Sequence, residues 1–142
     1  MNLKIYKDGA KFCLSKNLRF TDPRKYVLKI ISSSKYPLKA YDILKKLKKF
    51  IKNPQPPTVY RAIEFWQKNR FIHRVESLNA YKACDSHHSH EGSQFLICKD
   101  CGDVVESNFS ELSALIKSNL QKNSFRLDEW NLEINGVCCK CS

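Results

Sequence analysis

The chain has 142 residues, enough for one ordinary domain or two small ones, and its 25 Lys and Arg exceed its 14 Asp and Glu to give a net charge of +11. It opens with MNLKIYKDGAKF and has only short apolar runs, which argues against a secretory signal and a membrane span and leads us to expect a cytoplasmic protein. Its seven cysteines would stay reduced there, which favours metal binding over disulfides.

The positive charge is concentrated in the N-terminal part of the chain. Residues 1–82 hold 20 basic and 5 acidic residues, a balance of +15, whereas residues 83–142 hold 5 basic and 9 acidic residues, a balance of −4. A segment this positive repels itself unless it faces a polyanion such as nucleic acid. The distribution favours nucleic-acid binding over a merely soluble lysine-rich surface. The preferred interpretation of the lysine run at 45–52 is a solvated helix face, and the alternative is an edge that contacts phosphates.

Helical patterns dominate the chain up to Lys68. A weak apolar period covers 3–15, and Thr21-Asp22-Pro23 provides a capping threonine and a proline for a helix that breaks at Ser32-Ser33-Ser34. Over 39–50, apolar residues recur at helical spacing with lysines between them. Pro56-Pro57-Thr58 starts a further helix that runs to about Lys68.

Two short β patterns, FIHRVES and AYKAC, follow and predict a hairpin that turns at Leu78-Asn79. A winged helix-turn-helix consists of three helices followed by a two-stranded wing, and the pattern here has that outline. The last helix before the wing, here 57–68, enters the major groove in such a fold. Thr58, Tyr60 and Arg61 stand in its first two turns and are candidate DNA contacts. Alternatively, Tyr60 packs inward and Arg61 is a solvated charge.

The composition changes at about residue 83. CDSHHSHEGSQ is a polar, histidine-rich connection, and the segments after it predict two strands (QFLIC and DVVES), a helix over 109–122 and a strand over 125–134. This α/β half is too small to be stable without a metal or a partner chain.

Two CxxC pairs, Cys98/Cys101 and Cys138/Cys141, are the strongest chemical signal. Two-residue spacing lets both thiolates of a pair face one ion, and two pairs complete a tetrahedral zinc site with sulfur at ~2.3 Å. Such a site is structural because it leaves no coordination position for a substrate. Cys139 is either spare or a substitute ligand, and Cys13 is expected to be a small core residue.

A second group of candidate ligands surrounds the predicted connection. Imidazole, thiolate and carboxylate groups together suit zinc, and a shared ion is a better explanation of the group than a set of unrelated side chains. The group contains His73, Cys84, His87, His88, His90 and Glu106.

The blocks PPTVYRA and CKDCGDVVE, with RFTDPRKYVL, PLKAYDIL, FIHRVES, HHSH and NGVCCKC in the same order, resemble the ferric uptake regulator (Fur) family and its zinc uptake regulator branch. The resemblance covers nearly the whole chain. It implies an α+β protein with an N-terminal winged helix-turn-helix domain (1–82), a hinge (83–92) and a small α/β dimerisation domain with a structural zinc site (93–142).

Residue roles carry over by position. Cys98, Cys101, Cys138 and Cys141 match the structural zinc ligands. His73, Cys84 and Glu106 match regulatory zinc ligands, together with His88 or His90, of which we favour His90. Tyr41, Tyr60 and Arg61 match DNA-contacting positions.

Two features favour zinc sensing. Iron- and peroxide-sensing members usually have a histidine in the segment that is YPLKAYDIL here and an acidic residue at position 84. This chain has neither, and the thiolate of Cys84 prefers zinc to ferrous iron. There are also two departures from the family. Trp130 stands near the late histidine of a further site, which is therefore lost or altered, and Asn69-Arg70 replaces a glycine, with Asn69 expected to supply the left-handed cap.

The resulting hypothesis is a zinc-responsive repressor of zinc-uptake genes that binds double-stranded operator DNA as a homodimer, holds about two zincs per subunit and is not an enzyme. An iron- or peroxide-responsive repressor of the same family is the nearest alternative. A zinc deaminase is disfavoured because the H-x-E and P-C-x-x-C arrangement is absent. A zinc-ribbon interaction module without regulation is a further alternative.

Overall fold

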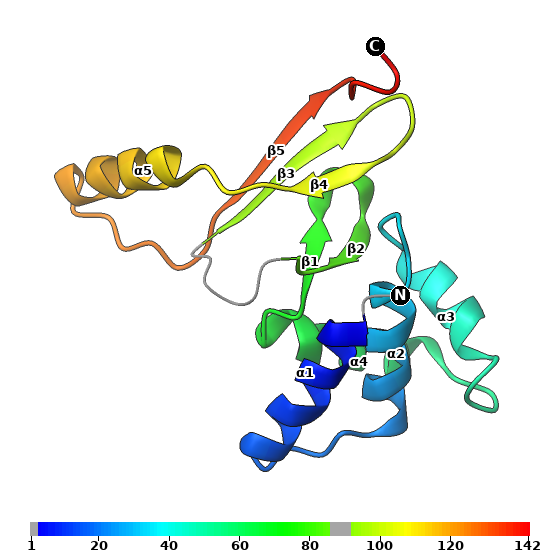
Figure 1. Ribbon diagram of the computed structural model, residues 1–142. Coiled ribbons are helices and arrows are strands. Elements are labelled where there is room, and N and C mark those ends of the chain that lie inside the picture. The colour runs from blue at the N-terminus through cyan, green and yellow to red at the C-terminus, as the bar shows by residue number, and fades with distance from the viewer. Residues whose placement is uncertain (1–2, 86–91) are drawn as a thin grey trace. The chain divides into compact units, whose positions relative to one another are not determined.

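The computed structural model describes residues 3–85 and 92–142. It divides into two compact units, Met1–His88 and Ser89–Ser142, which we call the N-terminal and C-terminal units (Figure 1). The candidate ligands His87, His88 and His90 lie outside the described residues. Within the described part of the chain, no helix is long and apolar enough to cross a bilayer.

The N-terminal unit is a helical bundle with a β-hairpin. Its core forms where the apolar stripes of α2 and α4 meet, since residues three and four apart lie on one face of a helix. Cys13 is buried in this core, as predicted. The elements are α1 (Leu3–Ser15), α2 (Asp22–Ser32), α3 (Ala40–Leu47), α4 (Pro56–Lys68), β1 (Ile72–Val75) and β2 (Ala80–Ala83).

Trp66 on α4 is the largest side chain at the centre of this core and is fully buried. Its indole N–H donates to the carbonyl of Arg24 at 2.8 Å, which satisfies the one polar atom of the ring. Gly9 on α1 lies against it: a Cβ there would come within 2.5 Å of Leu28 Cδ2 and 3.1 Å of the Trp66 ring. The absence of a side chain at Gly9 therefore lets α1 approach the pair α2–α4 closely.

The hairpin pairs β1 with β2 in antiparallel register from Ile72↔Ala83 to Val75↔Ala80. Leu38 forms an isolated antiparallel bridge beside β2, because its backbone and that of Tyr81 exchange hydrogen bonds of 2.9 and 2.8 Å. Together, the helices and the hairpin form the predicted winged helix-turn-helix.

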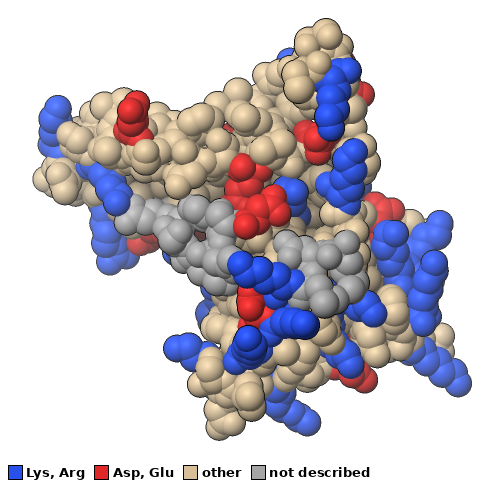
Figure 2. All heavy atoms as spheres, in the orientation of Figure 1, with Lys and Arg blue, Asp and Glu red and all other residues tan. Residues whose placement is uncertain are grey.

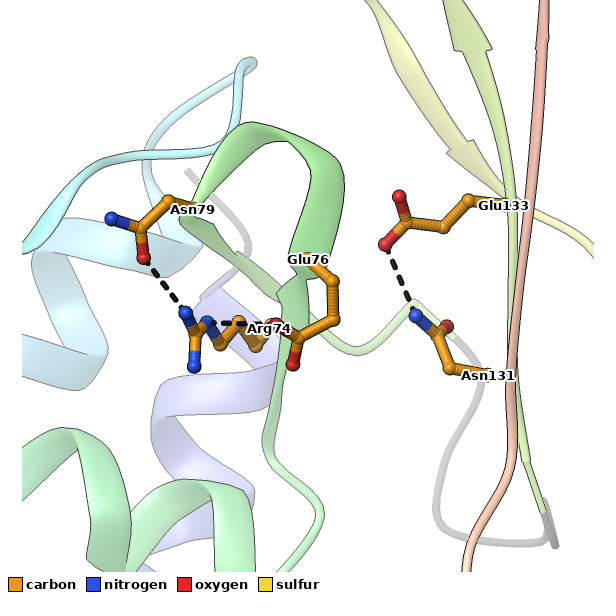
Figure 3. Close-up of polar contacts among 5 residues, drawn as sticks. All are labelled: Arg74, Glu76, Asn79, Asn131 and Glu133. Carbon is orange, nitrogen blue, oxygen red and sulfur yellow. Dashed lines mark hydrogen bonds and ion pairs between the residues drawn. The ribbon is translucent and has the colours of Figure 1, made fainter.

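The tip of the hairpin differs from the expected two-residue turn. It is a 3₁₀ turn, η1 (Glu76–Leu78), followed by Asn79 in the left-handed region at φ +47°. Arg74 holds the tip together: its guanidinium donates to Asn79 Oδ1 at 3.0 Å and pairs with Glu76 at 3.3 Å (Figure 3). The first predicted strand therefore ends at Val75.

The C-terminal unit is a three-stranded sheet in the order β4-β3-β5 with one helix. β3 pairs with β4 antiparallel and with β5 parallel, the latter in register from Ser93↔Asn131 to Cys98↔Gly136. On β5, Asn131 Nδ2 donates to Glu133 Oε1 at 3.1 Å (Figure 3). The elements are β3 (Ser93–Cys98), β4 (Val104–Glu106), α5 (Ser110–Lys122) and β5 (Asn131–Gly136).

Gln94 on β3 fixes the start of α5 and is one of the few buried polar side chains among the described residues. Its Oε1 accepts a hydrogen bond from the backbone N–H of Phe109 at 2.7 Å, and its Nε2 lies 3.4 Å from Ser113 Oγ. A free N–H at the helix start thus finds its partner in the neighbouring strand rather than in a capping side chain.

Three local predictions were wrong. Thr21 precedes α2 but makes no side-chain capping bond. Asn69 has φ −96°, and Arg70 takes the left-handed conformation at φ +59° instead, so the residue after the cap reverses the chain. The helix predicted over 39–50 ends at Leu47, after which Lys49 and Phe50 bond three residues back as tight turns.

The last strand was predicted too early. Ser124 adopts φ +53° after α5, and Phe125 is exposed. Strand structure begins at Asn131, where the chain first runs beside β3, and extends to Gly136 rather than ending at Ile134. An alternating pattern becomes a strand only where a neighbouring strand accepts its backbone hydrogen bonds.

Candidate metal centres and DNA-reading surface

The parallel pairing of β3 and β5 determines the first site. Because Cys98 ends β3 opposite Gly136, the CKDC and CCKC segments leave the sheet at the same end. Each pair then bends into a tight turn: Gly102 N–H donates to the Cys98 carbonyl at 3.0 Å, and Cys141 N–H donates to the Cys138 carbonyl at 2.9 Å. Gly102 has φ +72°, a conformation that glycine adopts without strain.

The sulfur atoms of Cys98, Cys101, Cys138 and Cys141 all lie within 4.8 Å of one another. The Sγ atoms of Cys101 and Cys138 are 3.8 Å apart, and those of Cys138 and Cys141 are 3.6 Å apart. A tetrahedral zinc with sulfur at ~2.3 Å requires sulfur–sulfur separations of about 3.8 Å. The four side chains therefore fit zinc in both ligand type and spacing, whereas the exposed Cys139 is not one of the four.

The surroundings of the cluster give its thiols different pKa values. Backbone hydrogen bonds from Cys101 and Cys138 lower the pKa of Cys98 to about 6, so this sulfur is a thiolate at neutral pH. At the other extreme, hydrogen bonds with the Cys138 and Cys101 thiols raise the pKa of Cys141 to about 12. The backbone of Asp103 lowers the pKa of Cys101, but the contacts with the Cys98 and Cys138 thiols and desolvation outweigh it, so that pKa is raised. Four sulfurs this close repel one another as thiolates, and a cation removes that repulsion.

The second candidate site includes a pair within the N-terminal unit. His73 lies on β1 opposite Lys82, and Cys84 comes two residues after Lys82, so the three side chains lie on one face of the hairpin. Cys84 is buried, its backbone N–H donates to the Phe71 carbonyl at 2.9 Å, and its sulfur lies within 4.8 Å of a His73 ring nitrogen.

A lysine that was not predicted as part of this site adjoins the pair. The Lys82 ammonium forms an ion pair with Asp85 at 3.3 Å, which partly neutralises a positive charge that would otherwise oppose a bound cation. The separation of three residues between Lys82 and Asp85 is the sequence signal that could have suggested it.

Glu106 belongs to the C-terminal unit. It ends β4 opposite Phe95 of β3 and is half-buried. His88 and His90, the remaining candidates for this site, lie outside the described residues.

The candidate DNA contacts lie on α3 and α4 and are largely accessible. Tyr41 near the start of α3 is 75% exposed, Tyr60 in the second turn of α4 is 54% exposed, and Arg61 is exposed. Thr58 is half-buried. Tyr60 does not pack inward, so the alternative interpretation of that residue is wrong. In the space-filling view, basic side chains gather over the visible face of the N-terminal unit and are dense at α3 (Figure 2).

Three comparisons place this architecture among known proteins. The sequence profile described as "Ferric uptake regulator family" matches residues 15–135. The chain is 34% identical to the zinc uptake regulation protein of Escherichia coli (strain K12) over 140 residues, which are 97% of this chain and 81% of that protein.

Two solved structures are similar over nearly their whole length. A zinc uptake regulator complexed with zinc and DNA superposes with a TM-score of 0.91 at 31% identity, covering 98% of this chain and 93% of the other. The holo form of XcZur superposes with a TM-score of 0.87 at 32% identity, covering 97% and 96%. With its winged helix-turn-helix and its four-cysteine cluster, this chain belongs to the ferric uptake regulator family.

Proposed function

We propose that this protein is a zinc-responsive transcriptional repressor that binds operator DNA as a homodimer in its zinc-loaded form and represses zinc-uptake genes. The observation that carries the proposal is the His73–Cys84 pair on the wing of a helix-turn-helix unit. A thiolate and an imidazole prefer zinc to ferrous iron, so Cys84 favours zinc over the iron- or peroxide-responsive alternative. The similarity to regulators named for zinc supports the same choice.

In this proposal each subunit holds two zincs with different tasks. Cys98, Cys101, Cys138 and Cys141 hold the structural ion, whose binding free energy becomes folding free energy for the C-terminal unit. This closed thiolate site has no open position for a substrate, so we infer a regulator and not an enzyme. Thiol ligands of this kind require a reducing compartment, which supports a cytoplasmic location.

The regulatory ion is assigned to His73, Cys84 and Glu106 with one histidine of the connection. His90 is favoured and His88 is the alternative. Its ligands come from both sides of a hinge at 83–92, between a DNA-binding domain at 1–82 and a dimerisation domain at 93–142. Shared ligands would restrict the hinge, so that the DNA-competent arrangement becomes the major population only in the zinc-loaded protein.

The DNA-reading face is assigned to the accessible sides of α3 and α4, with Tyr41, Thr58, Tyr60 and Arg61 as contacts. In a dimer, two copies of α4 would enter successive major-groove faces ~34 Å apart. Arg61 is the candidate for base recognition because arginine donates two hydrogen bonds to guanine.

Dimerisation is supported by an apolar face of the C-terminal unit. Leu96, Val105, Ile134 and Val137 are all partly exposed, and they line a shallow cleft of about 250 Å³ on the sheet. The described α5 helix buries none of its residues within one chain. Apolar area of this kind is stabilised by burial against a second copy, as in homodimer interfaces.

The test combines metal content with operator binding. Purified protein is expected to carry two zincs per chain and to lose one on mild chelation, together with operator affinity, while sedimentation still shows a dimer. Cys84→Ala with His90→Ala should abolish the zinc dependence, and Cys139→Ser, which removes a neighbouring thiol outside both ligand sets, should leave it intact. Operator binding that follows ferrous iron, or that is unchanged in the double variant, would overturn the proposal.

A further inference from the structure

A cleft of about 540 Å³ in the N-terminal unit lies beside the DNA-reading residues of α4. Its polar lining comes from the α1–α2 connection, the start of α2 and the first half of α4. The residues that matter here are Arg19, Thr21, Arg24, Thr58 and Arg61. No acidic side chain is among its described lining residues, so three guanidinium groups, two hydroxyl groups and the side-chain amide of Asn17 define its chemistry.

The α1–α2 connection is shaped to present Arg19. Asn17 adopts the left-handed conformation at φ +53°, which ends α1. The backbone N–H of Leu18 then donates to the Cys13 carbonyl at 2.8 Å, so the chain turns back sharply before Arg19. The side chain of Arg19 is exposed and therefore accessible to a ligand in the cleft.

Arg24 links the α1–α2 connection to α4. Its guanidinium lies over the Phe65 ring of α4 at 3.6 Å from the centroid, and its Nη1 donates to the Arg19 carbonyl at 2.6 Å. The Arg24 carbonyl in turn accepts the hydrogen bond from the Trp66 indole. These three contacts fix the backbone at Arg19 relative to α4, which makes Arg24 a positioning residue.

We propose that this cleft binds one phosphate of the DNA backbone, with Arg19 as its principal ligand and Arg24 holding Arg19 at a set distance from α4. Planar guanidinium groups and hydroxyl donors are the groups that proteins use for phosphate oxygens. Because Thr58 and Arg61 line the same cleft, a phosphate bound there fixes how deeply α4 enters the groove. The inference rests on the proposed function.

A phosphate contact differs measurably from a base contact. It carries no sequence information, so its loss weakens binding to every duplex by the same factor and lowers the salt dependence of binding. Removing one contact should decrease the slope of log K against log salt by about 0.9, and affinity at 0.15 M salt by roughly five-fold.

The experiment measures binding of full-length, zinc-loaded protein to its operator and to a duplex of unrelated sequence over a range of salt concentrations. Arg19→Gln should show the stated decrease in slope and equal losses on both duplexes. Lys68→Gln is the matched control, because it removes one exposed positive charge at the other end of α4, away from the cleft. It should leave the slope within about 0.3 of the wild type.

Arg24→Lys tests the positioning role, since it keeps the charge but cannot both stack on Phe65 and reach the Arg19 carbonyl. The slope should decrease as it does in Arg19→Gln, with zinc content unchanged. An unchanged slope in Arg19→Gln, or a loss confined to the operator, overturns the phosphate assignment. Zinc-dependent operator binding by the wild type in the same titrations tests the proposed function separately.

Discussion

The two units of this chain are stabilised in different ways. The N-terminal unit buries large apolar side chains from every one of its helices around Trp66. In the C-terminal unit, the buried apolar residues described are confined to β3 and β4, and neither α5 nor β5 buries a residue. One unit is therefore stabilised by packing, whereas the other is expected to depend on the proposed metal and second copy.

The difference in charge follows the same division. A large apolar core tolerates the charge balance of +15 over residues 1–82, which serves DNA binding. Residues 83–142 are slightly acidic, which suits the cation binding and self-association proposed for them. Each unit thus has its own source of stability and its own proposed ligand. Changes to one unit should therefore leave the other folded.

The largest expected effect is loss of the structural ion. Cys101→Ser with Cys138→Ser should unfold the C-terminal unit, because structural zinc contributes about 10–16 kcal/mol in small domains. Helix signals of the N-terminal unit should persist in circular dichroism, while proteolysis removes the chain beyond about position 92. Cys139→Ser should retain both the ion and the fold. Simultaneous unfolding of both units would show that the two units are not stabilised separately.

A core truncation should have the opposite pattern. Leu28 is fully buried in the N-terminal unit, and Leu28→Ala should lower the free energy of unfolding of that unit by about 2–5 kcal/mol. Zinc should not rescue it. The control is Leu14→Ala, since Leu14 is 84% exposed and its truncation should change stability by less than about 0.5 kcal/mol. Equal losses in the two variants, measured by urea denaturation, would contradict the assigned core.

Zinc affinity of the four-cysteine site should depend steeply on pH. The pKa values of Cys101 and Cys141 are raised, so each thiol carries a proton that zinc must displace at neutral pH. Protons therefore compete more strongly as pH falls, and affinity should decrease at least about 100-fold per pH unit, or ~2.7 kcal/mol. Because the pKa of Cys98 is lowered to about 6, the decrease should become steeper below pH 6.

Chelator competition at pH 5.5, 6.5 and 7.5 measures this dependence. The Cys139→Ser variant should follow the same curve, since Cys139 lies outside the ligand set. A decrease of less than ten-fold per pH unit would show that the cluster is already ionised without metal.

The smallest of these effects concerns Gln94. Gln94→Ala leaves the Phe109 N–H without its partner and should lower the stability of the zinc-loaded C-terminal unit by about 1–3 kcal/mol. Gln121→Ala on the exposed part of α5 is the matched control and should be neutral. Thermal unfolding followed by near-ultraviolet circular dichroism separates the two, and equal melting temperatures would remove Gln94 from the set of stabilising residues.

Local sequence patterns predicted most of the fold. The four N-terminal helices and the hairpin follow from apolar periodicity and from the prolines that start helices, because these signals can be read within each segment. The start of the parallel partner of β3 was misplaced because residues 125–128 alternate like a strand, whereas pairing with β3 begins only near Asn131. The tertiary fold decides where that pairing begins. Conformations at single residues, such as Arg70 in place of Asn69, depend on tertiary contacts in the same way.

The sites were predictable to different degrees. CxxC spacing pointed to the four clustered cysteines because each pair is local, but it left Cys139 open as a substitute ligand. The geometry groups Cys98, Cys101, Cys138 and Cys141. The buried Gln94 and the Arg19–Arg24 contact were not predicted. Each depends on a turn or a strand pairing that brings together residues without a shared motif.

The parallel pairing of β3 and β5 also affects how the C-terminal unit forms. Cys101 and Cys138 are 37 positions apart, so their approach closes a long loop before any parallel ladder contributes. A covalent crosslink over such a loop removes about 4 kcal/mol of conformational freedom from the unfolded chain, and an ion held by both cysteine pairs acts in the same sense. If zinc binds as proposed, we expect its supply to govern the rate at which this unit folds as well as its final stability, and newly made chains in a zinc-poor cell would expose an unpaired sheet edge for longer.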